Sequence, residues 1–157
     1  MQIPKGTNPE RRIESFLERH PEMIEPGLRL LQRQYPLKMI VPRMVGKIDL
    51  FCFGEDKADV AIELLAGPVT ANDLGQVMVY WDVLNGRAQI HSRPRPRLYI
   101  IGPSLTANFQ HALNVLDGGK QINLTVKILS IAHGTRLEDD EWTVEIRDHD
   151  PQLRIPL

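Results

Sequence analysis

The chain has 157 residues, of which 42% are hydrophobic, and this length and composition predict one globular domain over residues 1–157. The formal net charge of −1 excludes a uniformly basic surface, so any contact with DNA must come from a local patch. A single cysteine excludes an internal disulfide. No apolar run has the roughly 20 residues of a membrane span, and the first residues lack the apolar segment of a signal peptide. We therefore expect a cytoplasmic protein without membrane contact.

In chain order, the first half of the sequence predicts two helices and three strands. Ile13, Phe16 and Leu17 share one stripe of a helix over about residues 9–19. Pro21 opens a second, short helix that carries Glu25. The expected strands cover residues 28–36, 45–53 and 58–65, and the last two form a hairpin around the loop 54–57.

The second half predicts further alternation of helices and strands. Thr70, followed three residues later by Asp73, resembles the capping box that begins a helix. The polar stretch 86–97 contains Pro94 and Pro96 and is expected to be extended. The remaining expected elements are a strand at 98–101, a helix capped by Ser104, and strands at 122–131 and 142–146. We therefore predict an α/β fold with a mixed central β-sheet flanked by helices.

Two carboxylates interrupt the apolar hairpin. In a strand with a period of two, Asp49 shares its face with Phe51, and Glu63 shares its face with Ala61 and Leu65. A buried carboxylate normally pairs, becomes neutral or binds a metal, and oxygen ligands on adjacent strands suit Mg²⁺ or Mn²⁺. The alternative is that both acids are exposed at an edge, or paired with Lys47 or Arg43.

The order of several residues resembles a known nuclease family. Glu25, Gly46-x-Ile48-Asp49-Leu50, Ile62-Glu63-Leu64 and Gln76-x-x-x-Tyr80 occur in the order found in the PD-(D/E)xK nuclease superfamily, and within it they are most similar to the C-terminal catalytic domain of NucS-type DNA endonucleases. The stretches 16–28, 75–80 and 101–104 add to this similarity, which covers about residues 10–131 and leaves an added C-terminal strand region.

The resemblance implies a restriction-endonuclease-like fold and a metal-dependent phosphodiester endonuclease that acts in DNA repair. In that family the residues corresponding to Asp49 and Glu63, together with the backbone carbonyl of Leu64, hold Mg²⁺ or Mn²⁺. The family's catalytic set would further include Glu25, which helps to polarise water or the metal shell.

Gln76 and Tyr80 would orient the site or the DNA, according to the same resemblance. The alternatives are that Glu25 is a solvated acid at a helix end and that Gln76 and Tyr80 lie on a helix side that faces solvent.

One position departs from the family. The catalytic lysine follows the Glu-x pair, and this chain has Leu65 there. Lys47 lies two residues before Asp49, on the same predicted strand face, and is the candidate replacement. Its alternative role is that of an edge-strand lysine that discourages aggregation. The departure leaves open whether the chain cuts DNA.

The only dense basic stretch is the candidate nucleic-acid contact. An extended segment lays guanidinium groups along a phosphate backbone, and the residues in question are Arg87, Arg93, Arg95 and Arg97. The alternative is a solvated loop without a partner.

Two function classes therefore compete. The first is a nuclease that binds and cuts DNA, with weakened activity, and the second is a catalytically inactive module of nuclease fold for nucleic-acid binding or protein assembly. Because the chain lacks the N-terminal DNA-binding and dimerisation domain of NucS-type enzymes, a homodimer or a partner protein would supply DNA recognition. A metal-free binding domain with acids placed by chance is a third alternative.

Overall fold

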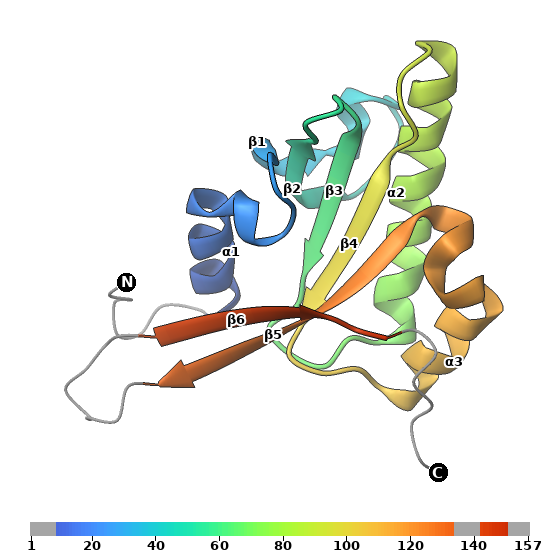
Figure 1. Ribbon diagram of the computed structural model, residues 1–157. Coiled ribbons are helices and arrows are strands. Elements are labelled where there is room, and N and C mark those ends of the chain that lie inside the picture. Colours follow the sequence, from blue (N-terminus) through green and yellow to red (C-terminus); the bar gives the residue numbers. More distant parts are fainter. Residues whose placement is uncertain (1–8, 134–141, 151–157) are drawn as a thin grey trace.

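A mixed six-stranded sheet runs through the molecule in the order β1-β2-β3-β4-β5-β6 (Figure 1). The computed structural model describes residues 9–133 and 142–150. The strands are β1 (Arg29–Pro36), β2 (Lys47–Phe53), β3 (Asp59–Leu64), β4 (Arg97–Gly102), β5 (Leu124–His133) and β6 (Trp142–Asp148). Neighbours are antiparallel from β1 to β3, parallel from β3 to β5, and antiparallel between β5 and β6. The predicted mixed central sheet is confirmed.

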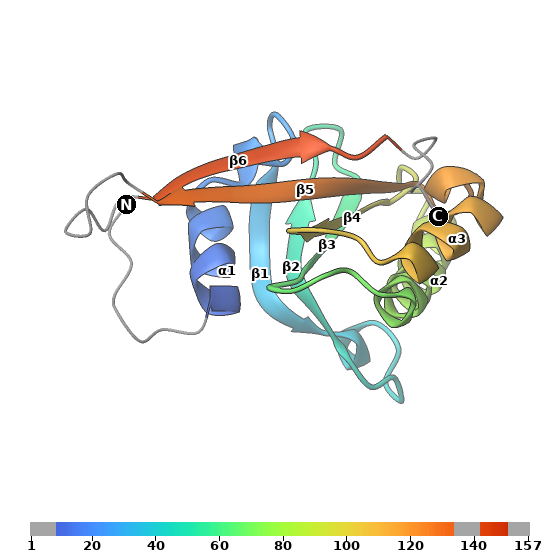
Figure 2. The same ribbon diagram turned by 90° about the horizontal axis from the view of Figure 1, so that it is seen from below.

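Helices cover both faces of this sheet (Figures 1 and 2). The α-helices are α1 (Pro9–Arg19), α2 (Ala71–Ile90) and α3 (Ala107–Val115), and three short 3₁₀ turns are η1 (Pro21–Met23), η2 (Leu37–Met39) and η3 (Asp117–Ile122). Helix α1 lies on one face, and α2 and α3 lie on the other. The predicted α/β class is confirmed.

The sheet separates two apolar clusters. On the α2 side, Phe51 and Ala61 pack with Val77, Leu84 and Phe109. The cluster on the α1 side contains Ile13, Leu17, Leu50, Cys52, Ile62 and Tyr99. All six residues of β3 are buried, because both of its faces are covered by helices. Glu63 therefore lies on a strand with no solvent-facing side.

Helix boundaries follow local capping, with two differences from the sequence prediction. The capping box predicted for Thr70 and Asp73 is confirmed, and in it the backbone N–H of Thr70 donates to Asp73 Oδ2 at 2.7 Å. Helix α2 continues to Ile90, so the prediction that residues 86–97 are extended throughout is wrong: burial of Ala88 against the core keeps the last turn helical. Helix α3 is capped by Thr106, whose hydroxyl accepts from Phe109, and not by Ser104.

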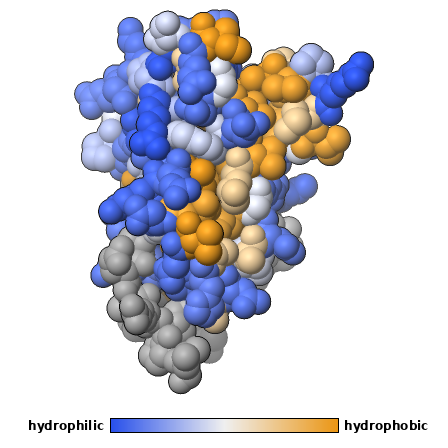
Figure 3. Space-filling view, turned by 90° about the vertical axis from the view of Figure 1, so that its right-hand side faces the viewer, coloured by the Kyte–Doolittle hydropathy of each residue, from blue (hydrophilic) through white to orange (hydrophobic). Residues whose placement is uncertain are grey.

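The α2 side of the molecule carries exposed apolar surface. Figure 3 shows this side, on which hydrophobic residues gather in patches. The described residues that contribute large exposed apolar side chains include Met39, Val41, Met78, Val79 and Ile90, of which Ile90 is 78% exposed. Across residues 9–133 and 142–150, no helix has the length and apolarity needed to cross a membrane.

Candidate functional site

Asp49 and Glu63 lie on neighbouring strands, β2 and β3. The register pairs Leu50 with Ile62, which makes Asp49 and Glu63 the next cross-strand neighbours. Glu63 is 7% exposed, and Asp49 is half-buried. Asp49 Oδ2 accepts a hydrogen bond of 2.8 Å from the backbone N–H of Leu64. The hairpin thus brings together the two carboxylates that interrupt its apolar pattern.

Tyr80 closes this site from the α2 side. Its hydroxyl donates toward two acceptors, Glu63 Oε2 at 3.0 Å and the carbonyl oxygen of Lys47 at 2.6 Å. Burial raises the pKa of Tyr80 far above its ordinary value, and the charge and hydrogen bond of Glu63 and the charge of Asp49 raise it further, against an opposing hydrogen bond from Gln76. Tyr80 is therefore a buried neutral donor, while Gln76, one turn earlier, is exposed.

Two residues that the sequence analysis did not single out complete the cluster. Gln34 Nε2 on β1 lies 3.3 and 3.2 Å from the two carboxylate oxygens of Glu14 on α1, and 3.2 Å from Asp49 Oδ1. Glu14 is buried, and its place beside Ile13 in the apolar stripe of the first helix was a usable signal. Gln34 had no such signal, because its role depends on strand pairing. We call Glu14, Gln34, Asp49, Glu63 and Tyr80 the acid cluster.

The position that the resemblance assigns to lysine is part of the apolar core. Leu65 is half-buried and packs against the cluster on the α2 side, and its backbone N–H donates to the carbonyl of Ile101 at 2.9 Å. The Lys47 side chain is exposed, and only its backbone carbonyl takes part in the acid cluster. Arg33 is a cation beside the acid cluster: its Nε lies 3.9 Å from Glu14, while its Nη1 binds Glu18 at 2.9 Å.

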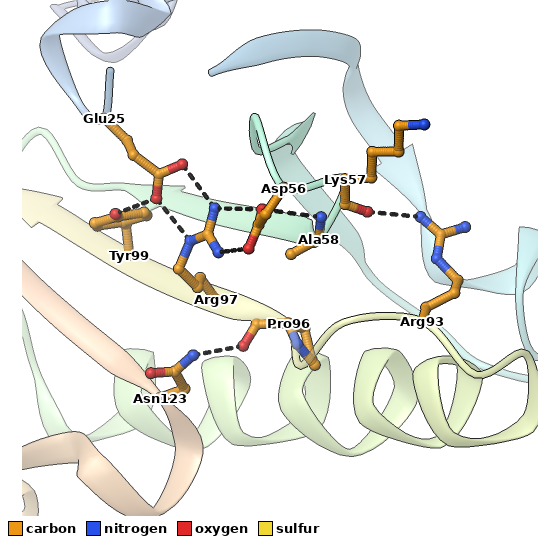
Figure 4. Close-up of polar contacts among 9 residues, drawn as sticks. All are labelled: Glu25, Asp56, Lys57, Ala58, Arg93, Pro96, Arg97, Tyr99 and Asn123. Carbon is orange, nitrogen blue, oxygen red and sulfur yellow. Dashed lines mark hydrogen bonds and ion pairs between the residues drawn. The ribbon is translucent and has the colours of Figure 1, made fainter. Parts of the chain in front are cut away.

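Glu25 belongs to a different set of contacts, so the expectation that it shares a site with Asp49 and Glu63 is wrong. Its carboxylate accepts from Arg97 Nε at 2.7 Å, from Arg97 Nη2 at 2.8 Å and from the Tyr99 hydroxyl at 2.8 Å (Figure 4). The same guanidinium binds Asp56 at 2.6 and 3.0 Å. The arginine satisfies both acids, which explains why Glu25 is held away from the acid cluster.

The sheet register separates this arginine network from the acid cluster. Arg97 pairs with Val60 at the start of β3, whereas Glu63, near the end of that strand, pairs with Ile100. Three residues of strand correspond to about 10 Å. Tyr99 also packs in the apolar cluster on the α1 side, and Ile100 in the one on the α2 side. Glu25 therefore has its structural partners about 10 Å along the sheet from Glu63, on the α1 side.

The other predicted nucleic-acid arginines also contact partners within the chain, although Arg95 is exposed. Arg93 Nη2 binds the buried carboxylate of Asp59 at 2.7 Å, and Arg87 Nε lies 3.5 Å from it. Burial raises the pKa of Asp59, and the two guanidinium groups oppose that rise. Arg95 lies over the Trp81 ring, 5.0 Å from its centroid, and donates to the carbonyl of Lys120. The guanidinium groups of the basic stretch therefore bind other parts of the same chain.

The donor chemistry of the acid cluster does not match a ready site for Mg²⁺ or Mn²⁺. Both oxygens of Asp49 accept hydrogen bonds, one from Leu64 and one from Gln34, and Glu63 accepts from Tyr80. Within the described part of the chain, no three carboxylate, histidine or cysteine side chains are placed so that they could hold an ion together. A cation would have to displace donors that these acids already use.

Comparison with known proteins places the fold. No family model matches the sequence, and no curated protein matches it. Solved structures do match. A repair endonuclease from Pyrococcus abyssi is 20% identical, with 79% of this chain and 48% of that chain covered and a TM-score of 0.59. EndoMS in a complex with dsDNA is 20% identical (80% of this chain, 46% of that chain, TM-score 0.57), and EndoMS in its apo form is 18% identical (79% of this chain, 47% of that chain, TM-score 0.54). The chain spans about half the length of these proteins. Its fold is that of the NucS-like repair endonucleases, as the sequence resemblance predicted.

Proposed function

We propose that this chain is a DNA-binding protein of nuclease fold whose capacity to cut phosphodiester bonds is reduced or lost. The observation that carries the proposal is Leu65, which is half-buried and packs against the apolar cluster on the α2 side where the resemblance requires a lysine. In the family that lysine orients the attacking water and stabilises charge in the transition state. Loss of one preorganised donor of this kind costs on the order of 10²–10³ in rate.

The positive groups near the acid cluster do not take over the lysine's role in this proposal. Arg33 pairs with Glu18 at 2.9 Å, and the Lys47 ammonium is exposed to solvent. Mg²⁺ or Mn²⁺ at Asp49, Glu63 and the Leu64 carbonyl remains a prediction of the nuclease alternative, because the acids use their oxygens for hydrogen bonds. Cleavage that requires Mn²⁺ and disappears with Lys47→Ala would favour that alternative.

The acid-free segment from residue 26 to residue 48 is the proposed DNA surface. It contains five lysines and arginines, Arg29, Arg33, Lys38, Arg43 and Lys47, between Glu25 and Asp49. Lys38, Arg43 and Lys47 are exposed, and none of the three has an ion pair with the part of the chain that the structure describes. Lysine and arginine side chains left in water are those that neutralise phosphates. The neighbouring fold solved with dsDNA supports the choice of DNA as the partner.

Salt dependence of DNA binding tests this surface. Each phosphate contact contributes a slope of about −0.9 to the plot of log affinity against log salt for duplex DNA. The triple variant Lys38→Gln, Arg43→Gln, Lys47→Gln should therefore lose about 2–3 units of slope, measured by fluorescence anisotropy with a labelled duplex. A matched triple variant, Lys57→Gln, Lys120→Gln, Arg147→Gln, removes the same charge from exposed sites elsewhere and should bind like the wild type. Equal loss in both variants would reject the surface.

Protein assembly is the second candidate function, and an apolar groove favours it. The groove, with a volume of about 740 Å³, lies between the loop 39–44 and the second half of α2. Its apolar lining includes Met39, Val41, Val83 and Ile90. Ile90 lies on α2 and outside the proposed DNA segment. Ile90→Asp should leave DNA affinity unchanged, and if it also abolishes an oligomer seen by light scattering, the groove is an assembly surface.

A further inference from the structure

Gln34 places a neutral carboxamide between two carboxylates. Its Nε2 lies 3.3 and 3.2 Å from the oxygens of Glu14 and 3.2 Å from Asp49 Oδ1. Ionised carboxylates only accept hydrogen bonds, so the NH₂ end of the amide must face them, and its two N–H groups provide one donor for each acid. The Glu14 side chain is 10% exposed, which limits the help that water gives to its charge.

A β-bulge places the amide in this position. The register of β1 against β2 shifts between Leu30, which pairs with Cys52, and Gln32, which pairs with Phe51. Without this one-residue shift, Arg33 would oppose Asp49; with it, Gln34 does. Gln34 also has a positive φ of 48°, a left-handed conformation that costs a residue other than glycine about 1–2 kcal/mol. The backbone is thus bent at a cost that delivers the Gln34 amide to the position between Glu14 and Asp49, while the Arg33 guanidinium binds Glu18 at 2.9 Å and approaches Glu14 only to 3.9 Å.

We propose that the Gln34 carboxamide takes the place of a divalent cation in the acid cluster, so that Glu14 and Asp49 are held together without metal. Gln34 is in this sense a positioning residue. The inference rests on the proposed function in one respect, because both treat the acid cluster as a nuclease site that no longer depends on metal. The inference adds that, once the amide is removed, the thermal stability of the protein depends on a divalent metal ion.

The consequence is a specific exchange between amide and metal. In the wild type, the two N–H groups supply the positive charge density that the acids need, and an ion gains little by displacing them. When position 34 offers no donor, Glu14 and Asp49 repel each other across an open gap. A divalent cation then relieves the repulsion, and the thermal midpoint rises by the linkage between binding and folding.

Thermal unfolding with and without Mn²⁺ tests the exchange. Gln34→Glu adds a third acid, and it should lower the midpoint at neutral pH by more than about 5 °C, as expected for a loss of roughly 2 kcal/mol in a chain of this size. Millimolar Mn²⁺ should restore most of this loss. The wild-type midpoint should move by less than about 1 °C under the same additions, because no new site is created.

A milder variant keeps the test decisive if Gln34→Glu fails to fold. Gln34→Met preserves the length of the side chain and removes both N–H groups, and it should also become stabilised by Mn²⁺. Gln32→Glu and Gln32→Met are matched controls on the same strand, because Gln32 is exposed like Gln34 but makes no side-chain hydrogen bond with the part of the chain that the structure describes. They should keep the wild-type midpoint and show no response to metal. Adding Asp49→Asn to Gln34→Met should remove the metal response.

Two results would overturn the inference. One is a wild-type protein that Mn²⁺ stabilises as strongly as it stabilises Gln34→Met, and the other is a pair of Gln34 variants as stable and as unresponsive as the Gln32 controls. DNA binding in the presence of EDTA, measured on the same samples, separates this failure from failure of the proposed function. If the wild type does not bind DNA, only the proposed function is rejected. If the Gln34 and Gln32 variants respond to Mn²⁺ as the wild type does, only the role of Gln34 is rejected.

Discussion

The Tyr80 hydroxyl on α2 lies 3.0 Å from Glu63 Oε2 on β3 and ties a helix to the most buried strand of the sheet. The contact joins residues 17 positions apart across the parallel crossover from β3 to β4. Because Glu63 is 7% exposed, its carboxylate depends on protein donors more than on water. The energy of this contact can be measured by removing one oxygen atom.

Tyr80→Phe should destabilise the protein by about 1–3 kcal/mol, because a buried charged acceptor loses its donor. Urea unfolding measures the change. Tyr99→Phe is the matched control: the Tyr99 hydroxyl also donates to a carboxylate, but Glu25 retains two N–H groups of Arg97. We therefore expect the control to lose less than Tyr80→Phe. The opposite order would show that water replaces Tyr80 at Glu63.

Cys52 should make the fold sensitive to alkaline pH. Burial, together with the charge of Glu25, raises the pKa of this thiol from 9.0 to about 12. The folded state then keeps a proton that the unfolded chain releases, so stability is complete below pH 9 and falls as the pH rises from 9 toward 12, with a slope of at most about 1.4 kcal/mol per pH unit from this group. Cys52→Ala should flatten the slope of unfolding free energy between pH 9 and 10, to which Tyr80 and Tyr99 also contribute. An unchanged slope in the variant would assign the alkaline loss to other groups.

Gly54→Ala should disrupt the arginine network. A Cβ at Gly54 would overlap Arg97 Nη2 and lie 2.6 Å from Asp56 Oδ1, so the guanidinium must leave its position between Asp56 and Glu25. Breaking this partly buried pairing should cost about 1–3 kcal/mol in unfolding free energy. Gly67→Ala is the control, because its Cβ would meet no atom within 4 Å. Equal effects of the two alanines would show that the cost does not come from the arginine network.

Leu65→Lys combined with Gln34→Glu should produce Mn²⁺-dependent cleavage of duplex DNA. Residue 65 follows Glu63 by two positions, so a lysine there directs its ammonium toward the acid cluster, and the new glutamate adds a ligand for the metal. Leu65→Lys combined with Gln32→Glu keeps the Gln34 amide between Glu14 and Asp49 and should cut DNA far more slowly. Gel assays of nicked and linear plasmid measure both. Equal rates in the two double variants would mean that the amide does not block the metal.

The order and type of the elements could be predicted because they follow local patterns. Alternating strands and amphipathic helices gave the mixed sheet, and the short hairpin loop left little freedom in the register that opposes Asp49 and Glu63. Helix α2 ran past its predicted end because Ala88 has a place in the core, which the local sequence does not reveal.

The errors concern partners that are distant in the sequence. Glu25 and Arg97 are 72 positions apart, and their contact depends on how η1 meets the start of β4. The sequence showed the charges of the arginine stretch. It did not show that acids distant in the chain, among them Asp59, pair with these arginines. Gln34 reaches Glu14 and Asp49 only because a bulge shifts the register by one residue. A single sequence carries little information on such pairings.

The same bulge affects how copies of the protein can meet. Strand β1 is at the edge of the sheet, and an edge strand with a regular backbone offers unpaired N–H and C=O groups to any other strand. Here the bulge, the left-handed Gln34 and the terminal Pro36 make the outer side of β1 irregular over most of its length. The geometry that positions an amide for the acids thereby also protects this edge of the sheet against extension by a further strand.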